Sequence, residues 1–367
     1  MRLIFCGGGT AGHVTPAIAI AEQILEKRPD AEILFVGRDG GDENQAIKKR
    51  GFNIKTVKIC GFERKLSLNN LKNLRIALSA LKKSKKIVKE FSPNVVIGTG
   101  GYVCWPVLKA AERLGIPTVI HESNAAPGLA TKLLAKKCDR VLLNLRGSEK
   151  EFKRQDNIRI VGNPVRQEFL KQDRTSARKK LGLTDKDLFI FSFGGSGGSQ
   201  KMNEAVIEFM ESHSTKNKNI RHTHVCGKKY FEEIKKKYPN LVYGKNGCII
   251  KPYIDEMALV TKAADVIISR AGAMTIAEIS AAGAAAILIP SPNVTNNHQY
   301  KNAKLLYDKG AAIMIEESEL NERTLSDAVK KLETDMRLRK KISEAIKDFC
   351  VLDSGEIIAN EVLSLGK

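Results

Sequence analysis

Aromatic residues are scarce in this sequence: they make up 6% of its 367 residues, and only one of them is tryptophan. Because proteins that bind single-stranded nucleic acid stack the bases on aromatic rings, this scarcity argues against that class of protein. Long hydrophobic runs are also missing, since none approaches the roughly 20 apolar residues of a membrane-spanning helix. The N-terminal apolar run gives way to glycine at Gly7, so a signal peptide is not expected.

Paired cysteines and acidic residues are the other deficits. The seven cysteines are scattered, with no C-x-x-C pair, which is typical of reduced, mostly buried thiols in a cytosolic protein. There is no cluster of carboxylates that would indicate a metal site. Asp and Glu total 41 against 61 Lys and Arg, so the net charge is +20 and the isoelectric point is near 9.6. This excess predicts a polyanionic neighbour: nucleic acid, an anionic membrane surface or phosphorylated substrates.

Glycine is concentrated where an apolar run meets a helical pattern. The segment "CGGGTAGHVTP" follows "RLIF" and precedes "AIAIAEQIL". Glycine removes the Cβ and permits positive φ, and a helix N-terminus presents unpaired N–H groups, so together they form an anion site, usually for phosphate. Gly7, Gly9 and Gly12 also fit the dinucleotide pattern G-x-G-x-x-G, with Asp39 as its ribose-binding acid. An NAD(P)-dependent oxidoreductase is therefore one alternative.

Short apolar runs alternate with longer amphipathic stretches, which indicates parallel sheets covered by helices on both faces. The plan of strand, glycine loop and helix starts again at "DLFIFSF" and "GGSGGS", and a single dinucleotide site leaves this second loop without a use. We therefore expect an α/β protein with two doubly wound domains that face a cleft suited to two substrates. The expected domains are 1–163 and 164–338, with a helical tail, 339–367, that packs back on the first domain.

The second half holds the stronger candidate for a nucleotide site. In "SRAGAMTIAEISAAG", Gly272 and Ala273 begin a helix directly after an apolar strand, so their N–H groups can hold a diphosphate. Glu278 lies just over one turn further along, where its carboxylate can accept both hydroxyls of a ribose. The polar segment "NVTNNHQYKNA" begins a helix at the end of another strand, and there His298 and Gln299 can reach sugar hydroxyls.

Seven segments, spread in order along the chain, carry motifs that occur together in one protein family. They are "GGTAGHVTPAIAIA", "IGTGGYVCWPV", "HESNAAPG", "VGNPVR", "GGSGGSQKMN", "RAGAMTIAEI" and "NHQYKNA". Together they resemble the MurG family of bacterial peptidoglycan glycosyltransferases. The resemblance implies a GT-B fold of two Rossmann-like domains, no cofactor or metal, and a peripheral position on the cytoplasmic face of the cell membrane.

The resemblance also implies a reaction and its partners. The reaction is the inverting transfer of GlcNAc from UDP-GlcNAc to the 4-hydroxyl of MurNAc in undecaprenyl-diphosphate-MurNAc-pentapeptide, which converts lipid I to lipid II. The N-terminal domain would bind this acceptor and the C-terminal domain would bind UDP-GlcNAc. Other cell-wall synthesis proteins are candidate partners, and nucleic acid is not.

Carried onto this chain, the resemblance implies a set of donor contacts. The backbone of Ile254 would meet the uracil, Glu278 the ribose and Gln299 the sugar. Local departures from the family pattern occur at Ser123 and His298. The implied contacts are Thr10, Ala11, Gly12, Asn124, Arg166, Ser196, Ile254, Ala273, Met274, Thr275, Ile276, Ala277, Glu278 and Gln299.

Two residues are candidates for the catalytic base. His13 follows the first glycine loop, where the helix N-terminus disfavours the imidazolium and keeps the ring neutral. A neutral imidazole can take up the proton of the attacking hydroxyl. His13 is alternatively a ligand of the acceptor's diphosphate, and Glu122 in "HESNAAPG" is the rival base.

The stretch from 66 to 91 predicts an amphipathic helix with an excess of cations. Its leucines recur at spacings of three and four, at Leu71, Leu74, Leu78 and Leu81. We expect the leucines to pack on the sheet and the cations to bind an anionic membrane surface; a merely solvated cationic face is the alternative. The residues expected at the membrane or acceptor are Leu71, Leu74, Arg75, Lys82, Lys83, Lys85, Lys86 and Trp105.

Overall fold

The computed structural model describes residues 1–9, 11–61, 68–195 and 197–366, and for residues 11 and 68–72 it describes the backbone alone. Two of the expected donor contacts, Thr10 and Ser196, lie outside the described residues, as do the side chains of Ala11 and Leu71. No helix within these ranges is long and apolar enough to cross a membrane.

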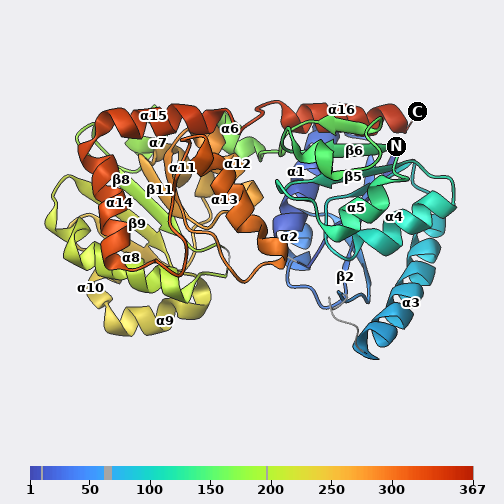
Figure 1. Cartoon of the computed structure of the whole chain (residues 1–367), viewed down its shortest axis with the longest axis horizontal. Coiled ribbons are helices and arrows are strands. Elements are labelled where there is room, and N and C mark those ends of the chain that lie inside the picture. The colour runs from blue at the N-terminus through green and yellow to red at the C-terminus, as the bar shows by residue number, and fades with distance from the viewer. Residues whose placement is uncertain (10, 62–67, 196, 367) are drawn as a thin grey trace. The chain divides into compact units, whose positions relative to one another are not determined.

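The chain folds into two compact units, which Figure 1 shows. Unit 1 comprises Met1–Val165 and Val351–Lys367, and unit 2 comprises Arg166–Cys350. Unit 2 is therefore continuous in sequence, whereas unit 1 is assembled from two segments of the chain.

Unit 1 is built on a parallel sheet whose seven described strands are β1 (Arg2–Cys6), β2 (Glu32–Arg38), β3 (Asn53–Val57), β4 (Val95–Gly98), β5 (Thr118–Glu122), β6 (Arg140–Leu143) and β7 (Ile158–Ile160). Their order across the sheet is β3-β2-β1-β4-β5-β6-β7. The inner strands β1, β4 and β5 are buried almost throughout. In β1 and β4 this agrees with their apolar runs, whereas β5 also buries the polar side chains of Thr118, His121 and Glu122. Phe5 of β1 lies beside Phe35 of β2 and Ile97 of β4.

Helices cover both faces of this sheet (Figure 1). They are α1 (Ala11–Lys27), α2 (Asn44–Lys49), α3 (Leu68–Phe91), α4 (Cys104–Arg113), α5 (Leu129–Ala135), the 3-10 turn η1 (Ser148–Glu151) and α16 (Ser354–Leu365). One apolar core lies under α3 and α4, and a second lies under α1 and α16. Ile358, Ala359 and Val362 of α16 are fully buried in the second core.

The buried face of α3 differs from the leucine face that the sequence suggests. Leu81 is buried, but Leu74 and Leu78 are 45% and 54% exposed. Ala77 and Ala80 are buried in their place, because α3 packs along α4 and short side chains fit a close contact between helices. The expectation that the leucines pack on the sheet is wrong for Leu74 and Leu78, which stand in solvent on a lysine-rich helix.

Unit 2 is built on a second parallel sheet, whose six described strands are β8 (Leu188–Phe193), β9 (Ile220–Val225), β10 (Cys248–Lys251), β11 (Val266–Ser269), β12 (Ala285–Leu288) and β13 (Ile313–Met314). Their order is β10-β9-β8-β11-β12-β13. The helical elements of this unit are α6 (Gln167–Lys171), α7 (Arg174–Lys180), α8 (Gln200–Ser212), η2 (Ser214–Lys216), α9 (Lys228–Lys237), α10 (Pro239–Tyr243), α11 (Met257–Ala263), α12 (Ala273–Ala282), η3 (Thr295–Asn297), α13 (His298–Asp308), α14 (Glu322–Thr334) and α15 (Met336–Lys347). Both units have the α/β architecture that the alternating runs predict.

The helical tail is divided between the units. α15 belongs to unit 2, where it packs against β12 and α12. Only the segment from Val351 onward belongs to unit 1, where α16 packs along α1. The segment that returns to the first unit is therefore shorter than the expected range 339–367, because Ile342 and Ile346 of α15 are buried in the core of unit 2.

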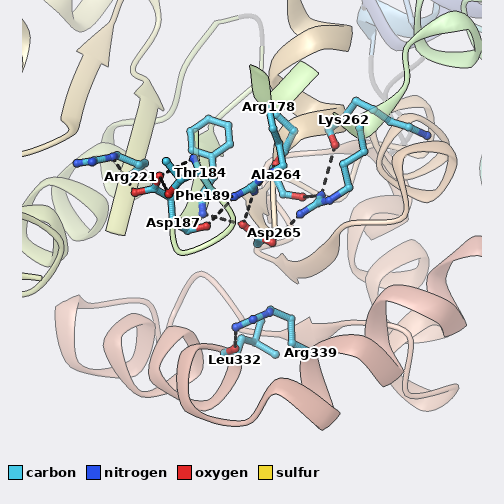
Figure 2. A network of polar contacts seen from close by, with 12 residues as sticks. Arg178, Thr184, Asp187, Phe189, Arg221, Lys262, Ala264, Asp265, Leu332 and Arg339 are labelled. Carbon is cyan, nitrogen blue, oxygen red and sulfur yellow. Dashed lines mark hydrogen bonds and ion pairs between the residues drawn. The ribbon is translucent and has the colours of Figure 1, made fainter. Parts of the chain in front are cut away.

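Asp265 joins three elements at the amino ends of the strands in unit 2 (Figure 2). It directly precedes β11, and its carboxylate accepts hydrogen bonds from Arg174 at 2.6 Å and Arg178 at 2.9 Å, both on α7. It also accepts a hydrogen bond from the backbone N–H of Phe189 on β8, at 2.8 Å. Open α/β sheets bind ligands at the carboxyl ends of their strands. These ion pairs lie at the amino ends, so they belong to the opposite edge of the sheet.

Asp187, which directly precedes β8, belongs to the same polar network (Figure 2). Its carboxylate accepts hydrogen bonds from the N–H and the hydroxyl of Thr184, both at 2.7 Å, and Arg221 lies 3.1 Å away. Burial raises the pKa of this carboxyl, but the hydrogen bonds from Thr184 and the charges of Arg221 and Arg178 together outweigh burial, so the pKa is lowered. The network thus fixes the start of the central strand by local and long-range contacts.

Two buried histidines lie in the sheet of unit 2. The hydroxyl of Ser192 lies between them, 2.8 Å from Nε2 of His222 and 2.9 Å from Nδ1 of His224. Nε2 of His224 also contacts Asn203 at 3.1 Å. Burial lowers the pKa of His224 to about 4 and that of His222 well below its usual value, so both rings are neutral at physiological pH. This environment agrees with a structural role for the pair.

Candidate active site

Glycine-rich turns occur in both units at the carboxyl ends of strands. In unit 1 one such turn joins β1 to α1 and another joins β4 to α4. In unit 2 one joins β8 to α8, and a shorter turn joins β11 to α12. Since open α/β sheets bind ligands at these ends, each unit has a candidate binding edge of its own.

The first turn of unit 1 holds His13 by its own backbone. Nδ1 of His13 lies 3.1 Å from the carbonyl oxygen of Gly8. The hydroxyl of Thr99 donates to the carbonyl oxygen of His13 at 2.7 Å. Gly100, with φ of +114°, lies so close that an added Cβ would fall 2.5 Å from Cδ2 of the imidazole. The turn between β4 and α4 therefore needs glycine at position 100, because the backbone there packs directly on the ring of His13.

Glu122 is buried and fully engaged at the end of β5. One carboxylate oxygen accepts hydrogen bonds from the backbone and side-chain amides of Asn124, both at 3.1 Å. The other oxygen accepts from the N–H of Gly128 at 3.0 Å and the hydroxyl of Thr131 at 2.8 Å. The carboxylate therefore shapes the turn that leads into α5 and orients Asn124, another of the expected site residues.

His121, the buried residue before Glu122, contacts the backbone of a distant segment. Its Nε2 lies 3.1 Å from the carbonyl oxygen of Gly162, which connects the end of β5 to the segment after β7. Burial lowers the pKa of His121, so the ring is neutral there.

In unit 2 the structure brings together two expected donor contacts that are far apart in sequence. Nε and Nη2 of Arg166 both lie 2.9 Å from Oε1 of Glu278 on α12. Arg166 also pairs with Glu168 at 2.7 Å. The side chain of Glu278 is 12% exposed, and burial raises its pKa although Arg166 acts in the opposite direction.

The rest of the expected donor segment contains both buried and half-buried side chains. The side chains of Met274, Ile276 and Ala277 are buried, so they can meet a ligand through the backbone alone. The side chains of Ala273 and Thr275 are half-buried, as is Glu278. Gly272 is the N-cap of α12 and has no side chain to accept from the first N–H groups, a feature of anion-binding helix ends.

The structure also describes four further residues expected at the site. Ile254 is buried, and Gly12 is exposed at the start of α1. Oε1 of Gln299 accepts a hydrogen bond from the N–H of Ser291 at 2.9 Å, which connects the start of α13 to the segment that follows β12. Nδ1 of His298 lies 2.9 Å from the carbonyl oxygen of Thr295.

Sequence reasoning missed Arg270, which directly follows β11. Its guanidinium donates to the hydroxyl of Ser199 at 2.6 Å and to the carbonyl oxygen of Ile289 at 3.2 Å, and it pairs with Glu317. Ser199 is the N-cap of α8, so Arg270 ties two of the turns of unit 2 together. Arg270 is the first residue of the segment "RAGAMTIAEI", but nothing local in that segment indicates its partners Ser199 and Glu317.

Comparisons with known proteins identify the family. The model of the glycosyltransferase family 28 N-terminal domain matches residues 3–143, and that of the C-terminal domain matches residues 189–351. A relative from Thermoanaerobacter sp. (strain X514) is 42% identical over 366 residues, which cover 100% of both chains. The chain belongs to glycosyltransferase family 28. A Clostridioides difficile (strain 630) relative is 39% identical over 367 residues, covering 100% of this chain and 89% of the other.

The names of these relatives and the solved structures of similar fold agree with this assignment. Both relatives are named UDP-N-acetylglucosamine–N-acetylmuramyl-(pentapeptide) pyrophosphoryl-undecaprenol N-acetylglucosamine transferase. The crystal structure of Acinetobacter baumannii MurG matches with a TM-score of 0.76 and 26% identity over 99% of each chain. The calicheamicin glycosyltransferase CalG4, with a TM-score of 0.68 and 14% identity, shows the same fold alone.

The expectations of a MurG-family member, a GT-B fold and a hexosyltransferase are thus confirmed. The oxidoreductase and nucleic-acid-binding alternatives receive no support from these relatives.

Proposed function

We propose that this family 28 enzyme transfers GlcNAc from UDP-GlcNAc to the 4-hydroxyl of MurNAc in lipid I, which forms lipid II for peptidoglycan. The names of relatives that are 42% and 39% identical over this whole chain support the substrates. The observation that carries the donor site is Glu278, which lies on α12 beyond its N-terminus and is held by Arg166.

In this proposal unit 2 binds the donor. The diphosphate of UDP lies at the N-terminus of α12, where the helix dipole and N–H groups favour anions. The carboxylate of Glu278 accepts hydrogen bonds from the ribose, and Arg166 supplies positive charge beside it. Gln299 contacts the sugar while its oxygen keeps the start of α13 in place.

The chemical step is a direct displacement with inversion. The 4-hydroxyl oxygen of MurNAc forms a bond to the anomeric carbon of GlcNAc, and the bond from that carbon to the UDP oxygen breaks. The electron pair of the broken bond goes to the diphosphate, whose growing negative charge is stabilised by N–H groups that are already oriented toward it.

His13 takes the proton of the attacking hydroxyl. A carbonyl oxygen only accepts hydrogen bonds, so the contact with Gly8 requires the proton on Nδ1 of the ring. In the neutral ring Nε2 then carries the lone pair and acts as the base. Glu122 is the weaker candidate, because both of its oxygens already accept hydrogen bonds from the turn that it shapes.

Replacing Glu278 with alanine tests the donor site. We expect the affinity for UDP-GlcNAc to fall about 10- to 100-fold, because hydrogen bonds to a charged group contribute about 1.5–3 kcal/mol. Isothermal titration with UDP-GlcNAc measures the change. The matched control is Glu208→Ala, an exposed glutamate on α8, which should bind the donor normally. Unchanged affinity in the Glu278 variant would rule it out as the ribose ligand.

We further propose that unit 1 binds the cytoplasmic face of the membrane through α3 and α5. On α3 the exposed Leu74 and Leu78 stand among exposed cations. On α5, Leu129 and Leu133 are 69% and 52% exposed, with Lys132 in the same short helix and Lys136 and Lys137 directly after it. Apolar side chains beside cations are the composition of a peripheral membrane surface. Trp105 is half-buried against the core, so it contributes less area than expected.

Reversing the charge of Lys82, Lys83, Lys85 and Lys86 to glutamate should weaken binding to vesicles of anionic lipid more than about tenfold at low salt, because each cation near the surface contributes about 1 kcal/mol. Binding of the parent protein should weaken as salt rises. Co-sedimentation with vesicles measures both effects, and UDP-GlcNAc affinity should stay unchanged.

The matched control carries the same charge change on unit 2, at Lys228, Lys229, Lys236 and Lys237 of α9. It should sediment with the vesicles better than the α3 variant does. Equal sedimentation of the α3 variant and the parent protein at low salt would mean that the charge of α3 is only solubilising.

A further inference from the structure

The peptide group between Gly8 and Gly9 has a partner at each end. Its carbonyl oxygen lies 3.1 Å from Nδ1 of His13. Its N–H donates to Oε1 of Glu43 at 2.6 Å. One peptide plane therefore connects a carboxylate, 34 residues away in sequence from Gly9, to the ring of the proposed base.

This peptide has little preference of its own for either orientation. Both flanking residues are glycine, and Gly9 has φ of +91°. Because glycine populates both signs of φ, turning the plane over costs little backbone energy. The reversed plane would direct its carbonyl oxygen at the carboxylate of Glu43 and its N–H at Nδ1 of His13. A fixed carboxylate therefore selects the observed orientation by electrostatics.

The side chain of Glu43 is itself fixed and is only 6% exposed. The Nε atom of Arg38 lies 3.8 Å from its Oε1. A Cβ on Gly41 would fall 2.7 Å from the same oxygen, so glycine at that position leaves room for the carboxylate. The carbonyl oxygen of Arg38 accepts a hydrogen bond from Asn44 at 2.8 Å, which keeps the turn after β2 in shape.

We propose that Glu43 is a positioning residue that sets the tautomer of His13 through the Gly8–Gly9 peptide. When Glu43 holds the N–H, the carbonyl oxygen faces the ring and the proton stays on Nδ1. Nε2 then carries the lone pair that accepts the proton of the hydroxyl. This inference rests on the proposed role of His13 as the base, and Glu43 touches neither substrate in it.

The imidazole nitrogens of the full-length protein, labelled with ¹⁵N, report the tautomer directly and need no substrate. The chain has six histidines, and the spectrum of His13→Ala identifies the signals of this one. In Glu43→Ala we expect a shift toward the proton on Nε2, and a fall in kcat of about tenfold or more with an unchanged KM for UDP-GlcNAc. Asp42→Ala removes an exposed acid next to Glu43 and should change neither the tautomer nor kcat.

Two conservative variants separate positioning from charge and remain informative if the alanine variant is unstable. Glu43→Gln removes the charge but keeps an oxygen within reach of the Gly9 N–H, so it should retain the tautomer and most of the turnover. Glu43→Asp keeps the charge but shortens the side chain, so it should shift the tautomer as alanine does. The reverse order of these two variants, or an unchanged tautomer in both Glu43→Ala and Glu43→Asp, would overturn the proposal.

The tautomer and the reaction are read separately, so two failures are distinguishable. If Glu43→Ala shifts the tautomer of His13 but turnover is normal both in that variant and in His13→Ala, the base role of His13 is overturned, and with it the catalytic importance of Glu43. If the tautomer of His13 is the same in the parent protein and in Glu43→Ala, the proposed effect of Glu43 on the tautomer is overturned, while the base role of His13 remains intact.

Discussion

His13→Ala should lower turnover by about 10²- to 10⁴-fold, the usual contribution of a general base, while UDP-GlcNAc affinity stays within about twofold. The reason is that His13 is held within unit 1, its ring by Gly8 and Gly100 and its backbone by Thr99, whereas the ribose and diphosphate contacts of the proposed donor site belong to unit 2. Transfer of labelled GlcNAc to lipid I measures turnover, and titration calorimetry measures donor binding.

A second histidine serves as the control for this experiment. His213 in unit 2 pairs with Glu333 at 2.7 Å and has no place in the proposed reaction. The variant His213→Ala should keep normal turnover. Near-normal turnover in His13→Ala would remove that residue from the mechanism and leave Glu122 as the candidate base.

Asp265→Ala should destabilise unit 2 by about 3 kcal/mol, because removing one partner of a largely buried ion pair leaves the other charges uncompensated. The variant leaves the guanidinium groups of Arg174 and Arg178 without their carboxylate, and the N–H of Phe189 on the central strand β8 without its acceptor. Urea unfolding of the full chain, followed by circular dichroism with and without UDP-GlcNAc, measures the loss.

The control for this variant is Asp185, which lies in the turn before β8. Asp185 is exposed, and its replacement by alanine should change the free energy of unfolding by less than about 0.5 kcal/mol. If the Asp265 and Asp185 variants unfold at the same urea concentration, the network in Figure 2 contributes no net stability.

Most of the fold could be predicted because a buried parallel strand is a continuous apolar run. The runs "RLIFC", "NVVIG", "DLFIFSF" and "DVIIS" all lie in strands. The strand β7 (Ile158–Ile160) could not be found in this way, because it is short and two of its three residues are exposed. The buried face of α3 was predicted wrongly for a related reason: leucine spacing does not show that Ala77 and Ala80 fit better against α4.

The glycine turns of the candidate site could also be predicted, since strand, glycine and helix signals are local. The partners that hold these turns could not. Glu43 contacts Gly9 across 34 residues, Arg166 contacts Glu278 across 112, and Arg270 contacts Ser199 across 71. Such pairs depend on which strands become neighbours in the sheet, and a single sequence has no local signal for that.

The return of α16 to unit 1 has a consequence for the order in which a newly synthesised chain can fold. Unit 2 is complete once Cys350 has left the ribosome. At that moment the apolar surface of α1 that Ile358, Ala359 and Val362 cover is still bare, although the rest of unit 1 was translated first. Domains usually fold during synthesis from the N-terminal one onward. Here the unit that begins first is finished last, and its apolar surface needs protection from aggregation until α16 has been synthesised.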